Sequence, residues 1–174
     1  AEMYHVPVFA IDVPMQQSEE NVAYVADQLR QLAKFLHTVT GRALDEEALR
    51  ARLRRSRRTL EKFRECQRAR ADRYVPTDLV TPLYSGMTNN ILLGSEAVET
   101  YADRLLADIK AAGPARGKRI YWMHTIPFWS EAVRHALAFR EEAQIVGCEL
   151  SQVCEPEFDP ESPFEAMAWR MVYH

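Results

Sequence analysis

Residues 113–148 read GPARGKRIYWMHTIPFWSEAVRHALAFREEAQIVGC, and they carry the clearest fold signal in the chain. The β-branched and aromatic run 119–126 predicts one strand, and residues 143–148 predict a second. Between them, Ser130 is suited to cap a helix that reaches about Phe139. Because strand, helix and strand follow one another, we expect a parallel pair joined by a right-handed crossover.

A last helix is predicted downstream of this unit. It begins at Ser162-Pro163-Phe164-Glu165, which has the form of a capping box with proline at the first helical position. Upstream, residues 18–112 predict helices almost throughout. We therefore expect an α/β protein with a largely helical N-terminal two-thirds, followed by the first βαβα of a parallel Rossmann-like sheet.

Local signals mark the ends of these helices. The first helix carries apolar side chains at spacings of 3, 4, 3, 4 and 3, namely Val22, Val25, Leu29, Leu32, Leu36 and Val39. Gly41 is placed to end this helix, and Asp45 is placed to cap the next. A third helix is predicted over residues 78–93, and a fourth follows Gly94-Ser95. The run 6–12 reads as a strand that precedes them all.

Composition excludes several classes of protein. The chain has 174 residues with 22 basic and 25 acidic side chains, so its net charge of −3 excludes a globally basic nucleic-acid binder. Three cysteines are too few for a secreted disulfide framework. No apolar run in the sequence is long enough to cross a bilayer, and no signal peptide is recognisable. We expect a soluble, cytoplasmic protein without a membrane partner.

The strongest local charge bias lies between Arg50 and Arg73, where eleven Lys and Arg face three acidic residues. Three interpretations stay open. The helix is paired with acidic neighbours, or it binds an anionic small molecule such as a phosphorylated cofactor tail through Arg54, Arg55 and Arg58. Nucleic acid is the least expected partner, and its binding would weaken steeply with added salt.

A candidate cleft follows from the predicted parallel strands, because ligands gather at the carboxyl ends of such strands. The residues that follow the two strands and make up this candidate cleft are His124, Thr125, Trp129, Ser130 and Glu149. The backbone N–H groups of the helix that opens at Ser130 are a candidate anion site. The structural alternatives are a hydrogen-bonded His124 and a Trp129 that packs in a core or an interface.

Metal and catalytic motifs are not found in the sequence. Cys148 and Cys154 are six positions apart, which matches no zinc or iron–sulfur signature. We expect Cys148 to be a small buried side chain and Cys154 to be a loop thiol. Glycine-rich phosphate loops, HExxH and GxSxG are also lacking.

Seven segments, in order along nearly the whole chain, resemble a family of 2-hydroxyacyl-CoA dehydratase subunits. This is the 2-hydroxyglutaryl-CoA dehydratase D-component family, which includes benzoyl-CoA reductase subunits. Each segment is a weak motif alone, and their order and spacing carry the resemblance. The segments are 6–14, 24–29, 40–45, 92–98, 119–129, 146–150 and 163–170.

The resemblance implies a lyase of anaerobic metabolism that is built from two related subunits, each with an iron–sulfur cluster held by cysteines. Such enzymes remove water from an (R)-2-hydroxyacyl-CoA through a ketyl radical. A separate ATP-dependent iron–sulfur activator supplies the electron, and the reductase relatives reduce an aromatic acyl-CoA. The implied partners are therefore a second homologous subunit, the activator and the acyl-CoA substrate.

The resemblance also implies domain limits. Residues 1–17 would be a late strand of a preceding α/β domain, 18–113 a helical region, and 114–174 the truncated start of a second α/β domain. The family's cluster cysteines lie before and after the matched segments, so none is transferred to Cys66, Cys148 or Cys154. We expect this chain to be an internal fragment that holds no cofactor and is inactive alone.

Two further expectations remain open. The parent is a dehydratase, or else a benzoyl-CoA reductase-type subunit or a non-catalytic helical interaction scaffold. Unpaired strand edges predict that the fragment associates as a homodimer or as a strand-exchanged oligomer.

Overall fold

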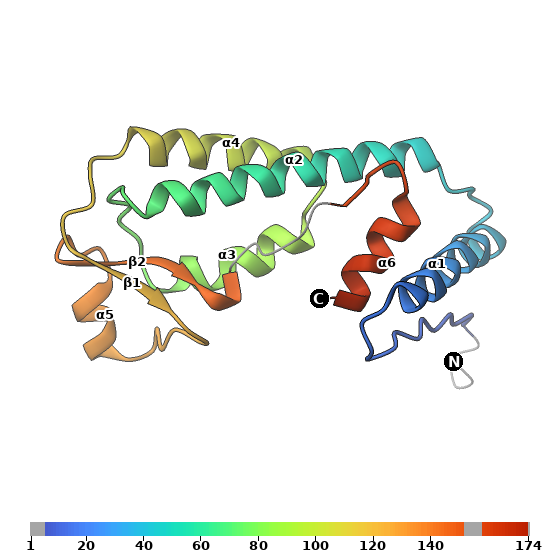
Figure 1. Cartoon of the computed structure of the whole chain (residues 1–174), viewed down its shortest axis with the longest axis horizontal. Coiled ribbons are helices and arrows are strands. Elements are labelled where there is room, and N and C mark those ends of the chain that lie inside the picture. Colours follow the sequence, from blue (N-terminus) through green and yellow to red (C-terminus); the bar gives the residue numbers. More distant parts are fainter. Residues whose placement is uncertain (1–5, 152–157, 174) are drawn as a thin grey trace. The chain divides into compact units, whose positions relative to one another are not determined.

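The computed structural model describes residues 6–151 and 158–173 (Figure 1). Their contacts divide them into two compact units: unit 1 holds residues 6–54 and 158–173, and unit 2 holds residues 55–151. The elements in chain order are α1 (Glu19–Thr40), α2 (Glu46–Arg70), α3 (Val80–Ile91), α4 (Glu96–Ala111), β1 (Lys118–Trp122), α5 (Glu131–Leu137), β2 (Ala143–Cys148), the 3-10 turn η1 (Glu149–Ser151) and α6 (Pro163–Tyr173). The predicted fold class is confirmed, because a mostly helical part precedes a parallel βαβ unit.

The predicted helix ends are confirmed by their capping contacts. Ser18 accepts a hydrogen bond from the backbone N–H of Asn21, so α1 starts where the sequence indicates. Gly41 has a left-handed φ of 70° and donates to the carbonyl of His37, which ends α1. The Asp45 carboxylate accepts from the N–H of Ala48 at 2.9 Å and so caps α2. Within the described residues, no helix is both long and apolar enough to cross a membrane.

The sheet of unit 2 has two parallel strands. Ile120 of β1 lies opposite Ile145 of β2, and the register is irregular between Ile120 and Tyr121. Helix α5 connects the strands and is capped by Ser130, as predicted. The core under this sheet contains buried apolar side chains from α3 and the residue before it, from β2 and from the turn after β1, namely Leu79, Leu83, Ile126, Ile145 and Cys148.

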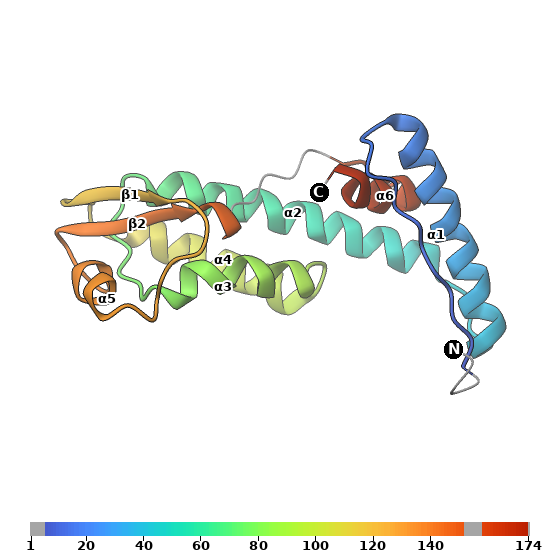
Figure 2. The ribbon, with the colours of Figure 1, turned by 90° about the horizontal axis from the view of Figure 1, so that it is seen from below.

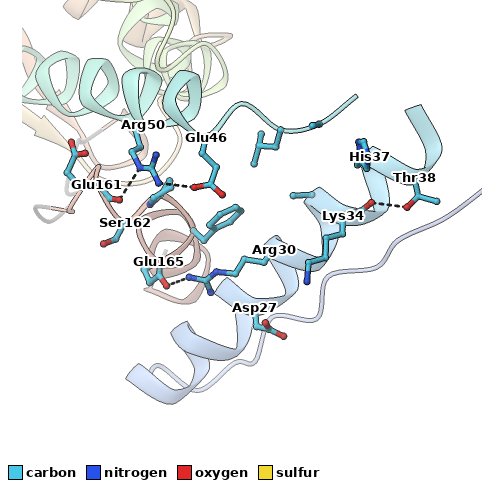
Figure 3. Close-up of a pocket in the computed structure, with 15 residues that line it drawn as sticks. Asp27, Arg30, Lys34, His37, Thr38, Glu46, Arg50, Glu161, Ser162 and Glu165 are labelled. Atoms are coloured by element: carbon cyan, nitrogen blue, oxygen red, sulfur yellow. Dashed lines mark hydrogen bonds and ion pairs between the residues drawn. The ribbon is translucent and has the colours of Figure 1, made fainter. Parts of the chain in front are cut away.

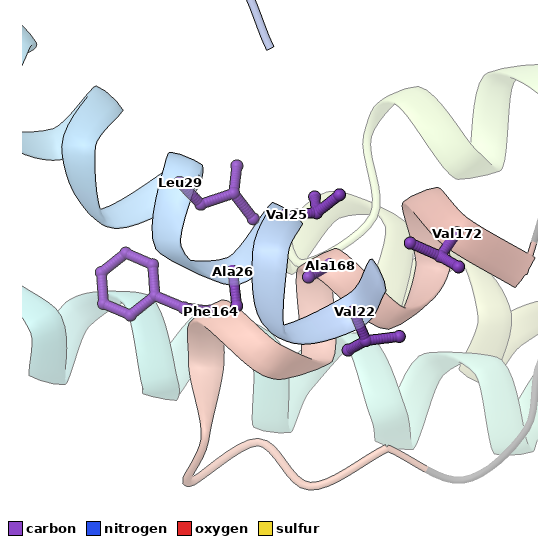
Figure 4. Packing of buried hydrophobic residues seen from close by; sticks show 7 residues of the cluster. All are labelled: Val22, Val25, Ala26, Leu29, Phe164, Ala168 and Val172. Carbon is purple, nitrogen blue, oxygen red and sulfur yellow. The ribbon is translucent and has the colours of Figure 1, made fainter. Parts of the chain in front are cut away.

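Helices α1 and α6 pack against each other in unit 1 (Figure 4). The small side chains of Ala26 and Ala168 are fully buried and let the two helices approach closely. The larger members of this core are Val22, Val25, Leu29, Phe164 and Val172. The first half of the predicted apolar stripe of α1 is buried. Leu36 and Val39, near the end of the stripe, are 46% and 48% exposed.

The expected strand over residues 6–12 is not formed in the structure. This segment runs beside α1 without a strand partner among the described residues (Figure 2). The side chain of Gln28 takes the place of a neighbouring strand, since its oxygen accepts from the N–H of Asp12 and its nitrogen donates to the carbonyl of Asp12, both at 2.8 Å. A strand requires a hydrogen-bonded neighbour in addition to an apolar pattern, and the pattern alone is insufficient.

The C-terminal helix also differs in detail from the expectation. The hydroxyl of Ser162 donates to Asp159 and the carboxylate of Glu165 pairs with Arg30, so the predicted capping box is replaced by these contacts. The apolar face of α6 packs on α1, which places the helix in unit 1 and not in the compact unit of the strands. The domain limits 1–17, 18–113 and 114–174 remain predictions.

Candidate functional site

The turn after β1 is the most constrained part of the candidate cleft. His124 has a φ of 64°, in the left-handed region that side chains other than glycine seldom adopt. The backbone N–H of His124 donates to Glu149 Oε2 at 2.9 Å, and Cys148 Sγ donates to the His124 carbonyl at 3.6 Å. Such strain persists only where surrounding contacts hold it, and here both contacts come from the end of β2.

The structure therefore brings together the carboxyl ends of the two strands, as the parallel pairing requires. The indole N–H of Trp122 donates to the carbonyl of Thr125 at 3.2 Å and fixes the next peptide of the turn. The expected strand 119–126 stops at Trp122, because the left-handed residue at 124 breaks the extended geometry. Among the candidates, His124 and Glu149 are thus in contact, and Thr125 lies half-buried beside them.

Trp129 and Ser130 lie further along the same connection. Trp129 is 66% exposed and packs edge-to-face on Phe128, with ring centroids 5.2 Å apart. The hydroxyl of Ser130 accepts from the N–H of Val133 and is therefore occupied as the cap of α5. Since α5 has only seven residues and this cap satisfies one of its free N–H groups, it offers a poor anion site.

The arrangement defines distinct roles for these side chains. His124 presents an exposed imidazole, and Trp129 presents an exposed apolar wall. Glu149 contacts the backbone of the turn, so it positions His124. The site can therefore offer a polar imidazole beside an apolar surface to a ligand.

Gly86 was not recognised in the sequence as part of this region. A Cβ at this position in α3 would lie 2.7 Å from the Cα of Ser151, so only glycine lets η1 approach α3 this closely. The available signal was a glycine inside a helical pattern, which often marks a close packing contact.

The candidate anion-binding arginines are all engaged by carboxylates. The pairs are Arg54 with Glu47 and Glu161, Arg55 with Glu96 and Glu99, and Arg58 with Glu99. Arg54 is held at 2.6 and 2.8 Å by its two partners, and Arg58 lies 3.0 Å from Glu99. This pairing agrees with the interpretation of a helix neutralised by acidic neighbours. Anion binding by Arg54, Arg55 and Arg58 remains a prediction, since a ligand would have to compete with these carboxylates.

The Glu99 ion pairs predict an acid-sensitive contribution to stability. Arg58 is the main cause that lowers the pKa of Glu99 below its ordinary value. The pairs therefore stabilise the fold fully above about pH 4.3, the usual pKa of an unfolded glutamate, and lose this effect as pH falls through the lower folded pKa. We expect the melting temperature of the wild type to fall more steeply than that of Glu99→Gln between about pH 5 and pH 3.

Glu142→Gln provides a matched control for this measurement. Glu142 is exposed and has no ion-pair partner in the described part of the chain. This variant should therefore keep the steep wild-type dependence on pH. Equal slopes for wild type and Glu99→Gln would contradict the assignment of acid sensitivity to Glu99.

The described residues do not fit an iron–sulfur cluster. Residues 6–151 and 158–173 contain no group of three His, Cys, Asp or Glu side chains that could hold a metal ion. Cys66 is buried, and burial raises the pKa of its thiol to about 11, which opposes the thiolate form that binds iron. Cys148 is buried as predicted, and Cys154 lies outside the described residues.

The fold and the site define a class of mostly helical proteins with a parallel βαβ unit. Polar residues of this unit meet at the carboxyl ends of its strands. Over residues 1–174 the sequence matches the family described as 2-hydroxyglutaryl-CoA dehydratase, D-component, and the chain belongs to this family. This match confirms the predicted family resemblance. No curated protein and no solved structure gives a significant match.

Proposed function

We propose that this chain is part of an iron–sulfur 2-hydroxyacyl-CoA dehydratase subunit, which converts an (R)-2-hydroxyacyl-CoA into an enoyl-CoA and water. The match of all 174 residues to the D-component family is the observation that carries this proposal. A second homologous subunit and an ATP-dependent activator that supplies one electron are its expected partners. We place the enzyme in the cytoplasm and its cluster cysteines in parts of the polypeptide outside these residues.

In this proposal, the turn from His124 to Ser130 faces the acyl-CoA cleft of the complete subunit. Two observations support it: the left-handed φ of His124, and the large exposed surface of Trp129. Glu149 acts as a positioning residue, because its carboxylate accepts the backbone N–H of His124 and thereby holds the main chain that carries the imidazole. Its loss should therefore affect turnover more than folding.

The test uses the complete subunit, assembled anaerobically with its partner subunit, the activator, MgATP and (R)-2-hydroxyglutaryl-CoA. Enoyl-CoA formation is followed for wild type, Glu149→Ala, Glu149→Gln and the exposed control Glu142→Ala. Glu149→Ala removes the hydrogen bond between the carboxylate and the backbone N–H of His124. We expect this loss to lower kcat about tenfold. We expect Glu149→Gln to recover most of this loss because its amide oxygen can still accept, and Glu142→Ala to behave as wild type.

The outcomes separate the alternatives. Reduction of an aromatic acyl-CoA in place of dehydration would assign the subunit to the benzoyl-CoA reductase type. Absence of turnover with either substrate class would contradict an enzyme and favour a helical interaction scaffold. Dehydratase activity of the 174-residue chain alone would contradict the placement of the cluster ligands elsewhere.

A further inference from the structure

Unit 1 contains an apolar groove of about 410 Å³. It lies between α1, the connection from α1 to α2, and α6, and its walls include Leu32, Leu36, Leu44, Leu49 and Met167. Leu36 and Leu44 are 46% and 45% exposed there, although both are large apolar side chains. Leu32 and Leu36 of the apolar stripe of α1 line this groove, and Val39 does not.

A second, more polar cavity of about 780 Å³ adjoins the groove (Figure 3). The two cavities share the side chains of Ala33, Ala43, Leu44 and Phe164 along their common border. Both volumes fall within the range of about 300–1,000 Å³ that is typical of small-molecule sites. Together they form one amphipathic cavity, apolar at one end and charged at the other.

Several acids of the polar cavity are already neutralised. Glu165 pairs with Arg30, and Arg30 in turn lies over the ring of Phe164. Glu46 pairs with Arg50 at 2.8 Å. These pairs leave no carboxylate of Glu46 or Glu165 uncompensated.

Basic side chains remain around this border without such partners. Lys34 and His37 line the polar cavity from α1, and Arg42 lines the apolar groove from the connection after α1. Across the described segments of the chain, no ion pair engages any of these three side chains. Of the other two acids that line the polar cavity, Glu161 pairs with Arg54, and Asp27 accepts from Gln31 at 2.6 Å. Lys34 and Arg42 therefore place two basic groups at this border that no described carboxylate engages.

We propose that this amphipathic cavity binds a small anionic amphiphile, of which a medium-chain carboxylate is the simplest example. The alkyl chain would lie in the groove against Leu36 and Leu44, where burial of apolar surface supplies the binding free energy. The carboxylate would lie toward Lys34 and Arg42, and Arg42 can contact both of its oxygens. The site is independent of the proposed cleft, since its lining residues all lie in unit 1 and the cleft residues all lie in unit 2.

The test is a calorimetric titration of the 174-residue chain with octanoate, below its micellar concentration, and with octylammonium as a probe of equal chain length. We expect saturable binding of octanoate and none of octylammonium at the same concentrations. Lys34→Gln should weaken octanoate binding about threefold to fivefold, as expected for an exposed charge.

The apolar end is tested by a matched pair of variants in α1. Leu36→Gln should weaken octanoate binding about tenfold, because a polar side chain replaces part of the groove wall. Val39→Gln should bind as wild type, since Val39 is similarly exposed, at 48%, and does not line the groove. Circular dichroism of both variants controls for their folding.

The contrary results are equally defined. Equal binding of octanoate and octylammonium, no saturable octanoate binding at millimolar concentration, or an equal loss in Leu36→Gln and Val39→Gln would each overturn the proposal. Flotation with vesicles of anionic phospholipid distinguishes the source of the anion. Flotation with vesicles in the absence of octanoate binding would assign the cationic border to a membrane surface and overturn a small-molecule site.

Discussion

Ile126→Ala is expected to lower the free energy of unfolding by about 2–5 kcal/mol. The side chain of Ile126 is fully buried in the core beneath the parallel strands, where it packs with Leu83 and Ile145. Truncation removes three methylene or methyl groups from this core and leaves a cavity that the strands and α3 cannot fill without moving. Urea denaturation followed by tryptophan fluorescence measures the loss, since Trp122 packs against the same core.

Ile91→Ala is the matched control in the same unit. Ile91 ends α3 with 78% of its surface exposed, so its truncation removes almost no packing. We expect a change within about 0.5 kcal/mol, as is usual for exposed positions. Similar effects of the two substitutions would mean that Ile126 is not packed as the structure shows.

Gly117→Ala is expected to disturb the parallel pairing at its first hydrogen bond. A Cβ at residue 117 would overlap the main chain of Glu141 and Glu142, which cannot move aside as a flexible side chain can. The neighbouring N–H of Lys118 donates to the carbonyl of Glu142 at 2.8 Å, so the clash falls where β1 and β2 first meet. Overpacking of this kind costs about 1–3 kcal/mol.

Amide hydrogen exchange in β1 and β2 measures this effect directly, because protection depends on the pairing of the strands. Gly113→Ala is the control, since nothing lies within 4 Å of a Cβ at that position. We expect the exchange of the strands to accelerate in Gly117→Ala and to stay at the wild-type rate in Gly113→Ala. Unchanged protection in Gly117→Ala would contradict the close approach of the two main chains.

Much of the secondary structure could be predicted because its causes are local. Ser18, Asp45 and Ser95 accept hydrogen bonds from N–H groups three residues ahead, and such a contact depends only on neighbouring residues. Gly41 ends α1 for an equally local reason, since glycine adopts the left-handed conformation without steric cost. The parallel pair was predictable from element order, because a helix between two strands permits few other arrangements.

The candidate cleft was predictable only in outline. Parallel strands imply that residues after β1 and after β2 meet, which brought His124 and Glu149 into one hypothesis. The contact itself joins the Glu149 carboxylate to the backbone N–H of His124. Which N–H the carboxylate reaches depends on the register between β1 and β2, and neither segment alone determines that register. The role of Gly86 was missed for the same reason, because the atoms of Ser151 that exclude a side chain are remote in sequence.

By itself the sequence determined the family, the helix ends and the order of strands and helices, since these depend on contacts within a few residues or on a pattern along the whole chain. Only the tertiary structure decided which acids neutralise Arg54 and Arg58, and that α6 packs on α1. It also left residues 6–12 without a strand partner in the described chain and left Leu36 and Val39 of the α1 stripe exposed. The physical reason is common to all of these: an apolar or charged pattern specifies that a side chain needs a partner, and the three-dimensional packing selects which one it finds.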